Sequence, residues 1–125
     1  MDAQRCNVVI PRWAGDLGQH GRRNGPQPVG NPPFSTKAWS SGIDPANDEF
    51  KRFEYGIPPV KNGDYAFLLH LIKSLKSKGK GAIILPHGVL FRGNKEADIR
   101  RNLVKRGLIK GIIGLPANLF YPPHV

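Results

Sequence analysis

Residues 81–86 read Gly81-Ala82-Ile83-Ile84-Leu85-Pro86, a short apolar run that ends at a proline. A continuously apolar run of this length is typical of a buried parallel strand. A glycine-containing loop with His87 and Arg92 follows it. Open α/β sheets bind their ligands at the carboxyl ends of such strands. The run therefore predicts an α/β fold with a site beyond Pro86.

Helical patterns flank this strand on both sides. Residues 64–76 repeat apolar side chains at helical spacing, with Asp64 as an N-cap or first-turn carboxylate and Gly79 as the end. Residues 95–106 predict a second helix that ends at Gly107, and residues 108–115 predict another strand. The side chains expected to face inward are Tyr65, Leu68, Leu69, Ile72, Leu75, Ala97, Ile99, Leu103 and Val104, and those expected outward are Arg100, Arg101, Lys105 and Arg106. Helix, strand, helix, strand is half of a doubly wound α/β sheet.

Residues 31–34 read Asn31-Pro32-Pro33-Phe34. The prolines fix two backbone angles, and Asn31 is pushed out of the helical region, so the loop is stiff and extended. The Asn31 side-chain oxygen and the Pro32 carbonyl then form two acceptors for a planar amine, and Phe34 can stack on the ring that carries it. Two such hydrogen bonds draw the amine nitrogen out of plane and free its lone pair for methyl transfer. The plain alternative is a turn, because Asn-Pro and Pro-Pro pairs are common in loops.

The segments around this tetrapeptide carry little regular pattern. Residues 1–30 contain one apolar run, Val8-Val9-Ile10, and are otherwise rich in Gly, Arg, Asn, Gln and Pro, so we expect them to be irregular or disordered. No strand is expected directly before Asn31. Residues 35–63 predict a long loop in which Lys37 and Trp39 are candidate DNA contacts. The aromatic residues of this loop have a second interpretation, in which they pack the loop against its own domain.

Composition narrows the function classes. The chain has 125 residues, 15 of them Gly and 12 Pro, and a formal net charge of +10, which favours an anionic partner such as nucleic acid. One cysteine excludes an internal disulfide and suits a reducing compartment. We expect no membrane span, no signal peptide and a bacterial cytoplasmic location.

Metal and nucleotide motifs are not expected. His87 has no second His, Cys or acid at ligand spacing, so no metal site is predicted. We see no carboxylate pair and no nucleophile–base arrangement. The spacing of Gly79 and Gly81 fits neither a P-loop nor a dinucleotide fingerprint.

Three sequence blocks follow the tetrapeptide in a characteristic order and spacing. The blocks are Asp64-Tyr65-Ala66-Phe67-Leu68-Leu69-His70, Ala82-Ile83-Ile84-Leu85-Pro86-His87-Gly88-Val89-Leu90-Phe91-Arg92-Gly93, and Ile112-Ile113-Gly114-Leu115-Pro116-Ala117-Asn118-Leu119-Phe120. Over about residues 30 to 121 the chain resembles the modification (M) subunit of type I restriction-modification systems. These are adenine-N6 DNA methyltransferases that use S-adenosylmethionine.

The resemblance implies an enzyme family and a set of site residues. Asn31 and Pro32 would accept the adenine N6 amine, Phe34 would stack on the base, and Pro33 would hold the loop. Possible DNA contacts are Lys37, Trp39, His87 and Arg92. The implied partners are double-stranded DNA and the specificity and restriction subunits of a type I system.

The resemblance covers only the second half of the catalytic domain. We therefore expect a partial Rossmann-like methyltransferase sheet in residues 31–121, with residues 1–30 as a non-family segment and residues 122–125 as a tail. The S-adenosylmethionine loop of the first half is not recognisable, so the chain alone is expected to be inactive. The alternative function is a catalytically dead, basic nucleic-acid-binding remnant of such a gene.

Overall fold

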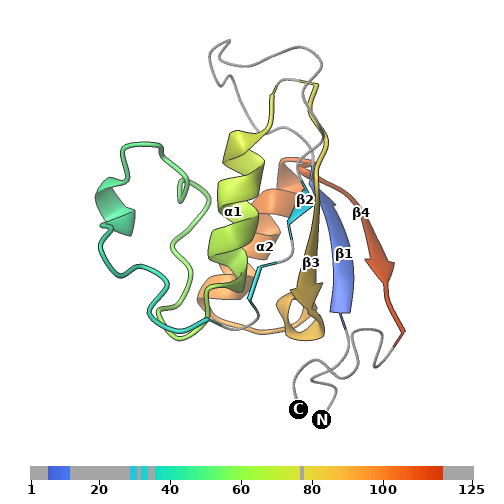
Figure 1. Cartoon of the computed structure of the whole chain (residues 1–125), viewed down its shortest axis with the longest axis horizontal. Helices are drawn as coiled ribbons and strands as arrows, with labels where there is room; N and C mark the ends of the chain where they lie inside the picture. Colours follow the sequence, from blue (N-terminus) through green and yellow to red (C-terminus); the bar gives the residue numbers. More distant parts are fainter. Residues whose placement is uncertain (1–5, 12–28, 31, 34–35, 77, 117–125) are drawn as a thin grey trace.

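A four-stranded mixed sheet with two helices forms the framework of the chain (Figure 1). The computed structural model describes residues 6–11, 29–30, 32–33, 36–76 and 78–116. Its elements in order are β1 (Cys6–Pro11), β2 (Val29–Gly30), a 3-10 turn η1 (Pro45–Asn47), α1 (Asp64–Ser74), β3 (Ala82–Pro86), a 3-10 turn η2 (His87–Leu90), α2 (Lys95–Lys105) and β4 (Ile109–Gly114). The helix and strand content confirms the α/β class.

The strands are arranged in the order β2-β3-β1-β4. Short β2 pairs parallel to β3, with Val29 opposite Ala82 and Gly30 opposite Ile83. β1 pairs antiparallel to β3 on one side and to β4 on the other. β3 and β4 consequently run in the same direction, one strand apart, and α2 connects them across the sheet.

Two expectations for the first thirty residues are wrong. Cys6–Pro11 forms a strand inside the sheet, although an irregular segment was expected there. The three-residue run Val8-Val9-Ile10 is too short to predict a strand alone, but β3 and β4 supply backbone partners on both of its sides. Val29–Gly30 also pairs as a strand directly before the tetrapeptide. The expectation for residues 12–28 lies outside the described residues.

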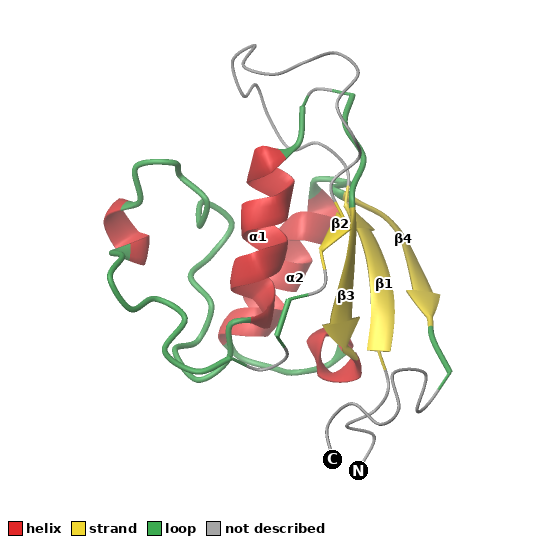
Figure 2. Ribbon diagram, in the orientation of Figure 1, coloured by secondary structure: helices red, strands yellow, loops and turns green. Residues whose placement is uncertain are grey.

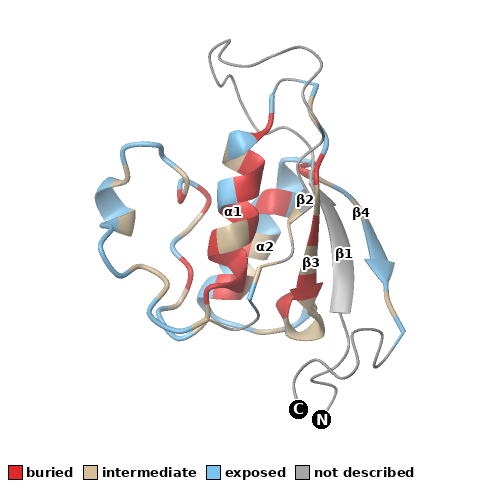
Figure 3. Cartoon of the chain, in the orientation of Figure 1, coloured by how far each residue is buried: buried red, intermediate tan, exposed pale blue. Residues whose placement is uncertain are grey.

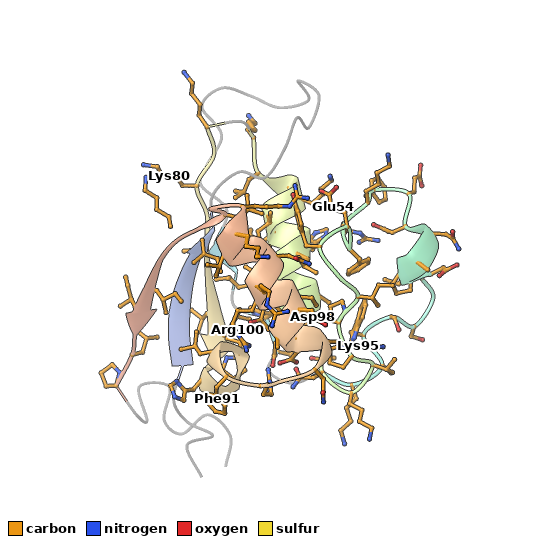
Figure 4. The ribbon with its side chains drawn as sticks, turned by 180° about the vertical axis from the view of Figure 1, so that it is seen from behind. Glu54, Lys80, Phe91, Lys95, Asp98 and Arg100 are labelled. Carbon is orange, nitrogen blue, oxygen red and sulfur yellow. The ribbon has the colours of Figure 1, made fainter. Side chains whose placement is uncertain are left out.

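The core lies between the helices and one face of the sheet. Figures 1 and 4 show α1 and α2 on the same side of the sheet, and Figure 3 shows that both helices contain buried residues. β3 alternates, so Ile83 and Leu85 enter the core while Ala82 and Ile84 are half-buried. The helix residues that meet them are fully buried and comprise Leu68, Leu69, Ile72, Ile99 and Leu103. Each such side chain contributes about 1.5–3 kcal/mol relative to full exposure.

Most of the predicted helix faces are confirmed. All five inward residues predicted for α1 are buried. The helix ends at Ser74 rather than near Gly79, because Leu75 turns to an extended conformation. In α2, Val104 is exposed and Arg100 is half-buried, opposite to the prediction for both. Among the described helices, none is long and apolar enough to span a membrane.

The segment between β2 and α1 is largely irregular, as Figure 2 shows. Phe53 and Tyr55 are buried in the core cluster, so the packing interpretation holds for these two aromatic residues. Asp48 accepts hydrogen bonds from both the backbone and the guanidinium of Arg52. The hydrogen bonds from the Arg52 side chain lower the pKa of Asp48 to about 2. The two buried rings fix the loop against the helices, and the bonds between Asp48 and Arg52 stabilise the loop itself.

We predict slow amide hydrogen exchange in β1. Hydrogen bonding on both sides of a strand protects its amide groups, whereas Glu49 and Phe50 lie in the irregular segment and should exchange fast. Val9→Pro should destabilise the chain, because a proline cannot donate to an interior ladder. The checks are exchange measured by mass spectrometry and urea unfolding. Exchange in β1 as fast as at Glu49 would contradict the sheet order.

Candidate functional site

The carboxyl ends of β2 and β3 meet at one end of the sheet, which we call the carboxyl edge. Because the two strands are parallel and adjacent, the residues after Gly30 and after Pro86 leave the sheet at this same edge. Pro32 is half-buried and Pro33 is exposed. Asn31 and Phe34 lie outside the described residues. The described prolines of the tetrapeptide, Pro32 and Pro33, thus follow β2 at the end of the sheet at which the His87–Leu90 turn follows β3.

The segment after the tetrapeptide is attached to the start of α1. The Thr36 hydroxyl donates to the Pro33 carbonyl at 3.1 Å, and the Thr36 carbonyl accepts from the Gly63 amide at 2.9 Å. A side chain at Gly63 would place its Cβ 2.8 Å from Trp39 Cβ, so only glycine allows this close approach. Pro33 is therefore connected through Thr36 and Gly63 to the residue that begins α1, Asp64.

Asp64 belongs to a buried ionic cluster centred on Arg92. Arg92 Nη2 donates to Asp64 Oδ2 at 2.7 Å, and Arg92 Nε donates to Glu96 Oε2 at 2.7 Å. The Asp64 side chain is 0% exposed and that of Glu96 3%, while Arg92 is 29% exposed. We call Asp64, Arg92 and Glu96 the Arg92 cluster. It joins the first turns of α1 and α2 to the loop that follows β3.

The same loop is held from two further directions. Arg100 Nη1 donates to the carbonyl oxygens of Val89 and Arg92 at 3.0 Å each, and the Tyr65 hydroxyl donates to the Val89 carbonyl. Gly88 allows the guanidinium to lie against the backbone, since a Cβ there would be 3.2 Å from Arg92 Cζ. Burial raises the pKa of the Tyr65 hydroxyl, which therefore stays a hydrogen-bond donor. These contacts make the loop a rigid platform.

Glu96 is the member of the Arg92 cluster whose charged form is disfavoured by burial. Burial raises the pKa of Glu96, and the adjacent Arg92 guanidinium offsets part of that rise. Its Oε1 atom is buried and has no hydrogen-bond partner among the described residues. For a carboxyl group whose pKa is raised by folding, the stabilising contribution is largest at low pH and is lost as pH rises through the folded-state pKa.

The structure gives several predicted DNA contacts a partner within the chain. The Trp39 indole donates to the Pro59 carbonyl at 2.9 Å, and its ring lies 5.2 Å from that of Phe53. Arg92 is held by the two carboxylates. Lys37 is exposed, and the ring of His87 lies edge-on to that of Phe91 at 5.3 Å. It stays a prediction that DNA is contacted by Lys37, Trp39, His87 and Arg92. The hydrogen bonds and ion pairs that Trp39 and Arg92 make within the chain favour a structural role for these two side chains.

Three residues of this edge make contacts that the sequence analysis did not predict. Asp64 is the first-turn carboxylate of α1, one of the two positions expected for it, and is also an ion partner of Arg92. Arg100 was expected to face outward, and no role was predicted for Glu96. Glu96 follows Arg92 by four residues, which is a signal for a helical ion pair, but Asp64 lies 28 residues away. Two carboxylates therefore share one cation where no carboxylate pair was expected.

Metal binding has no support in the described part of the chain. No group of three or more His, Cys, Asp or Glu side chains comes together there in a way that could hold an ion. The two acids at the carboxyl edge are both committed to Arg92.

Comparisons with known proteins assign the chain to a family. The family model described as N-6 DNA Methylase matches residues 26–125. The chain is 32% identical over 96 residues to the type I restriction enzyme MjaIX methylase subunit of Methanocaldococcus jannaschii, which covers 74% of this chain and 17% of that protein. It is 34% identical over 96 residues to the HindI methylase subunit of Haemophilus influenzae, covering 74% of this chain and 20% of the relative.

A third relative covers a shorter part. The EcoKI methylase subunit of Escherichia coli is 36% identical over 69 residues, which are 55% of this chain and 13% of that protein. The chain thus spans at most a fifth of the length of these relatives. The longer matches confirm the resemblance to type I methylase subunits.

This family implies the use of S-adenosylmethionine as methyl donor. A carboxylate that grips the donor's ribose must present its oxygens at the surface of the site. Asp64 and Glu96 are buried behind Arg92 instead, so the described carboxyl edge does not fit the donor. The described residues fit a role in holding the acceptor loop.

We predict that Arg92→Met destabilises the chain by roughly 3–5 kcal/mol, because it removes the guanidinium from two buried carboxylates. Without the guanidinium, burial should raise the pKa of Glu96 further, so the variant should lose stability as pH rises from 4 to 7. Urea unfolding at several pH values measures this.

Arg101→Met is the matched control for this prediction. Arg101 Nη1 pairs with Asp98 Oδ1 at 3.0 Å, but both side chains are largely exposed. Its loss should cost no more than about 1 kcal/mol and should add no pH dependence. Equal effects of the two substitutions would contradict the role assigned to the Arg92 cluster.

Proposed function

Because the chain belongs to the N-6 DNA methylase family, we propose that residues 31–34 form the target-base loop of an adenine-N6 DNA methyltransferase. The enzyme would be the modification subunit of a type I restriction-modification system. The observation that carries this proposal is that the tetrapeptide follows β2 directly in the sequence, and that β2 is paired parallel to β3. Ligands of open α/β sheets bind at the carboxyl ends of such strands.

Each residue of the loop has a proposed role. The Asn31 side-chain oxygen and the Pro32 carbonyl accept the two N–H groups of the adenine N6 amine, and Phe34 stacks on the base. Pro33 keeps the loop extended. The adenine must leave the DNA duplex to reach them. The paired acceptors draw the amine nitrogen out of the ring plane, which exposes its lone pair for methylation.

The surrounding fold supports a stiff acceptor loop. Thr36 and Gly63 attach the loop to α1, and the Arg92 cluster attaches α1 to the platform after β3. Alignment matters because a misplacement of about 1 Å at a reacting centre can lower a rate by about 100-fold. We propose that β2, β3 and β4 are the second half of a doubly wound sheet. A donor-binding half completes it in the longer relatives.

The proposed partners follow from the relatives. The protein would bind double-stranded DNA in the cytoplasm together with specificity and restriction subunits. S-adenosylmethionine supplies the methyl group when it is bound. The described residues position the acceptor loop, and no donor-binding role is assigned to any of them.

A second candidate function is nucleic-acid binding without chemistry, and the distribution of charge favours it. Seven cations gather where α1 and α2 end and β3 and β4 begin, which we call the amino edge: Lys73, Lys76, Lys78, Lys80, Lys105, Arg106 and Lys110. Figure 4 shows Lys80 at this end of the sheet and Phe91 at the other. Lys73 pairs with Glu54 at 3.1 Å. This edge is basic enough to attract phosphates independently of the tetrapeptide.

We predict that the 125-residue chain neither binds S-adenosylmethionine nor methylates DNA. Calorimetric titration and a labelled methyl-transfer assay on adenine-rich duplexes test this. A chimaera in which residues 26–125 replace the matching segment of the HindI methylase subunit should be active. In that chimaera Asn31→Ala should lower transfer by about 100-fold or more, since one amine acceptor is lost.

Asn47→Ala is the control for the chimaera. Asn47 lies in the exposed turn η1, bonded to Asp44, and its loss should leave transfer unchanged. Methylation by the 125-residue chain that depends on Asn31 would contradict the first part of the prediction. An active chimaera indifferent to Asn31→Ala would contradict the proposed function.

We also predict weak, sequence-indifferent DNA binding with a clearly negative salt dependence. The logarithm of the binding constant should fall by about 0.9 per logarithmic unit of salt for each phosphate neutralised. Changing Lys76, Lys78 and Lys105 together to Gln should flatten this slope, while Lys37→Gln with Lys61→Gln should change it less. Fluorescence anisotropy over a salt series measures both. An affinity independent of salt would contradict the prediction.

A further inference from the structure

Phe91 is the most exposed large apolar side chain in the described part of the molecule. Its exposed fraction is 65%, although it follows directly after a turn that is half-buried apart from the buried Val89. Figure 4 shows the residue at the carboxyl edge, beyond the ends of the strands. The residues that precede it in sequence, Val89 and Leu90, are buried and half-buried, so Phe91 is the exposed apolar residue of this turn. A single exposed ring of this kind is too small for a stable protein interface.

The backbone that carries the ring is held rigidly. The amides of Phe91 and Arg92 both donate to the Gly88 carbonyl, at 3.1 Å and 2.9 Å. The next side chain, Arg92, is held by Asp64 and Glu96, and Arg100 donates to the Arg92 carbonyl. The His87 ring meets the Phe91 ring edge-on. A ring that is both exposed and pre-positioned loses little conformational entropy when a planar ligand stacks on it.

The charges around the ring favour a nucleobase as that ligand. Asp64 and Glu96, the two acids bonded to the adjacent Arg92, are buried and neutralised by its guanidinium, so they do not repel a phosphate chain. Exposed Lys37 follows the tetrapeptide, and exposed Lys95 begins α2 at the far end of the loop that carries Phe91. Aromatic side chains among cations are the usual platform for unpaired bases. An apolar protein segment would gain little from these cations.

We propose that Phe91 stacks on an unpaired nucleobase of the nucleic-acid strand that reaches the acceptor loop. This base is a neighbour of the adenine assigned to residues 31–34, so the inference rests on the proposed function and extends it. Phe91 thereby holds the strand open next to the target base. The Arg92 cluster acts as the positioning device for this ring.

Binding to short single strands tests the inference without methyl transfer. The 125-residue chain is titrated at low salt into a dye-labelled twelve-nucleotide adenine strand and into a strand of the same length with abasic sites. Phe91→Ala should weaken binding to the adenine strand about 5- to 150-fold, the effect of losing one base–aromatic stack. Binding to the abasic strand should not change, because its phosphates are intact.

Two control variants separate stacking from general effects. Phe50→Ala removes an equally exposed ring, 62% accessible, from the loop between β2 and α1, and it should leave both affinities unchanged. Phe91→Trp should retain the adenine-strand affinity, because an aromatic face is preserved. Circular dichroism and urea unfolding establish that each variant is folded.

The outcomes distinguish this inference from the proposed function. Equal adenine-strand affinity for the folded Phe91→Ala variant and the unsubstituted chain would overturn the inference alone. An equal loss on the abasic strand would also overturn it, since the effect would not involve bases. Self-association that disappears in Phe91→Ala, seen by sedimentation, would assign the ring to a contact between copies instead. Absence of any binding by the unsubstituted chain would overturn the inference and the proposed DNA-binding role together.

Discussion

The Arg92 guanidinium lies between two buried carboxylates, and the arrangement of the carboxyl edge depends on it. Asp64 begins α1, Glu96 lies in the first turn of α2, and Arg92 itself belongs to the loop after β3. Three segments that are distant in sequence therefore meet at one cation. Buried ion pairs of this kind add little net stability, but they are very costly to break. Their value here is geometric, because they fix where the loop after β3 can lie.

The acceptor loop depends indirectly on the same ion pairs of Arg92, because a series of hydrogen bonds connects it to Asp64. Pro33 is bonded to Thr36, and Thr36 is bonded to Gly63, which directly precedes Asp64. A displacement of α1 would thus move both the tetrapeptide segment and the platform that carries Phe91. The same ion pairs neutralise Asp64 and Glu96, the two acids at the carboxyl edge that could otherwise repel DNA. The lysines that dominate the net charge lie at the opposite, amino edge.

β1 is an interior strand of the sheet that comes from outside residues 26–125, the part of the chain matched by the family model. It nevertheless runs antiparallel between β3 and β4 and supplies backbone partners to both. Without it β3 would present an unpaired edge and β4 would lose its partner in the described sheet, and unpaired edges are sites for non-specific strand association. The segment before the family match thus has a structural role in this chain.

The local sequence pattern was sufficient to predict the two helices, the strand at residues 82–86 and the inward face of α1. The sequence motifs were sufficient to predict the family. These features depend on side chains a few residues apart, and their periodicity is readable directly. The place of β1, the pairing of β2 and the partners of Arg92 were decided by tertiary structure alone. Val9 meets Ile83, and Asp64 meets Arg92, across tens of residues with no periodic signal between them. Arg100 and Val104 were misplaced for the same reason, since the carbonyl groups of the η2 loop, rather than the helical pattern, determine which side of α2 is buried.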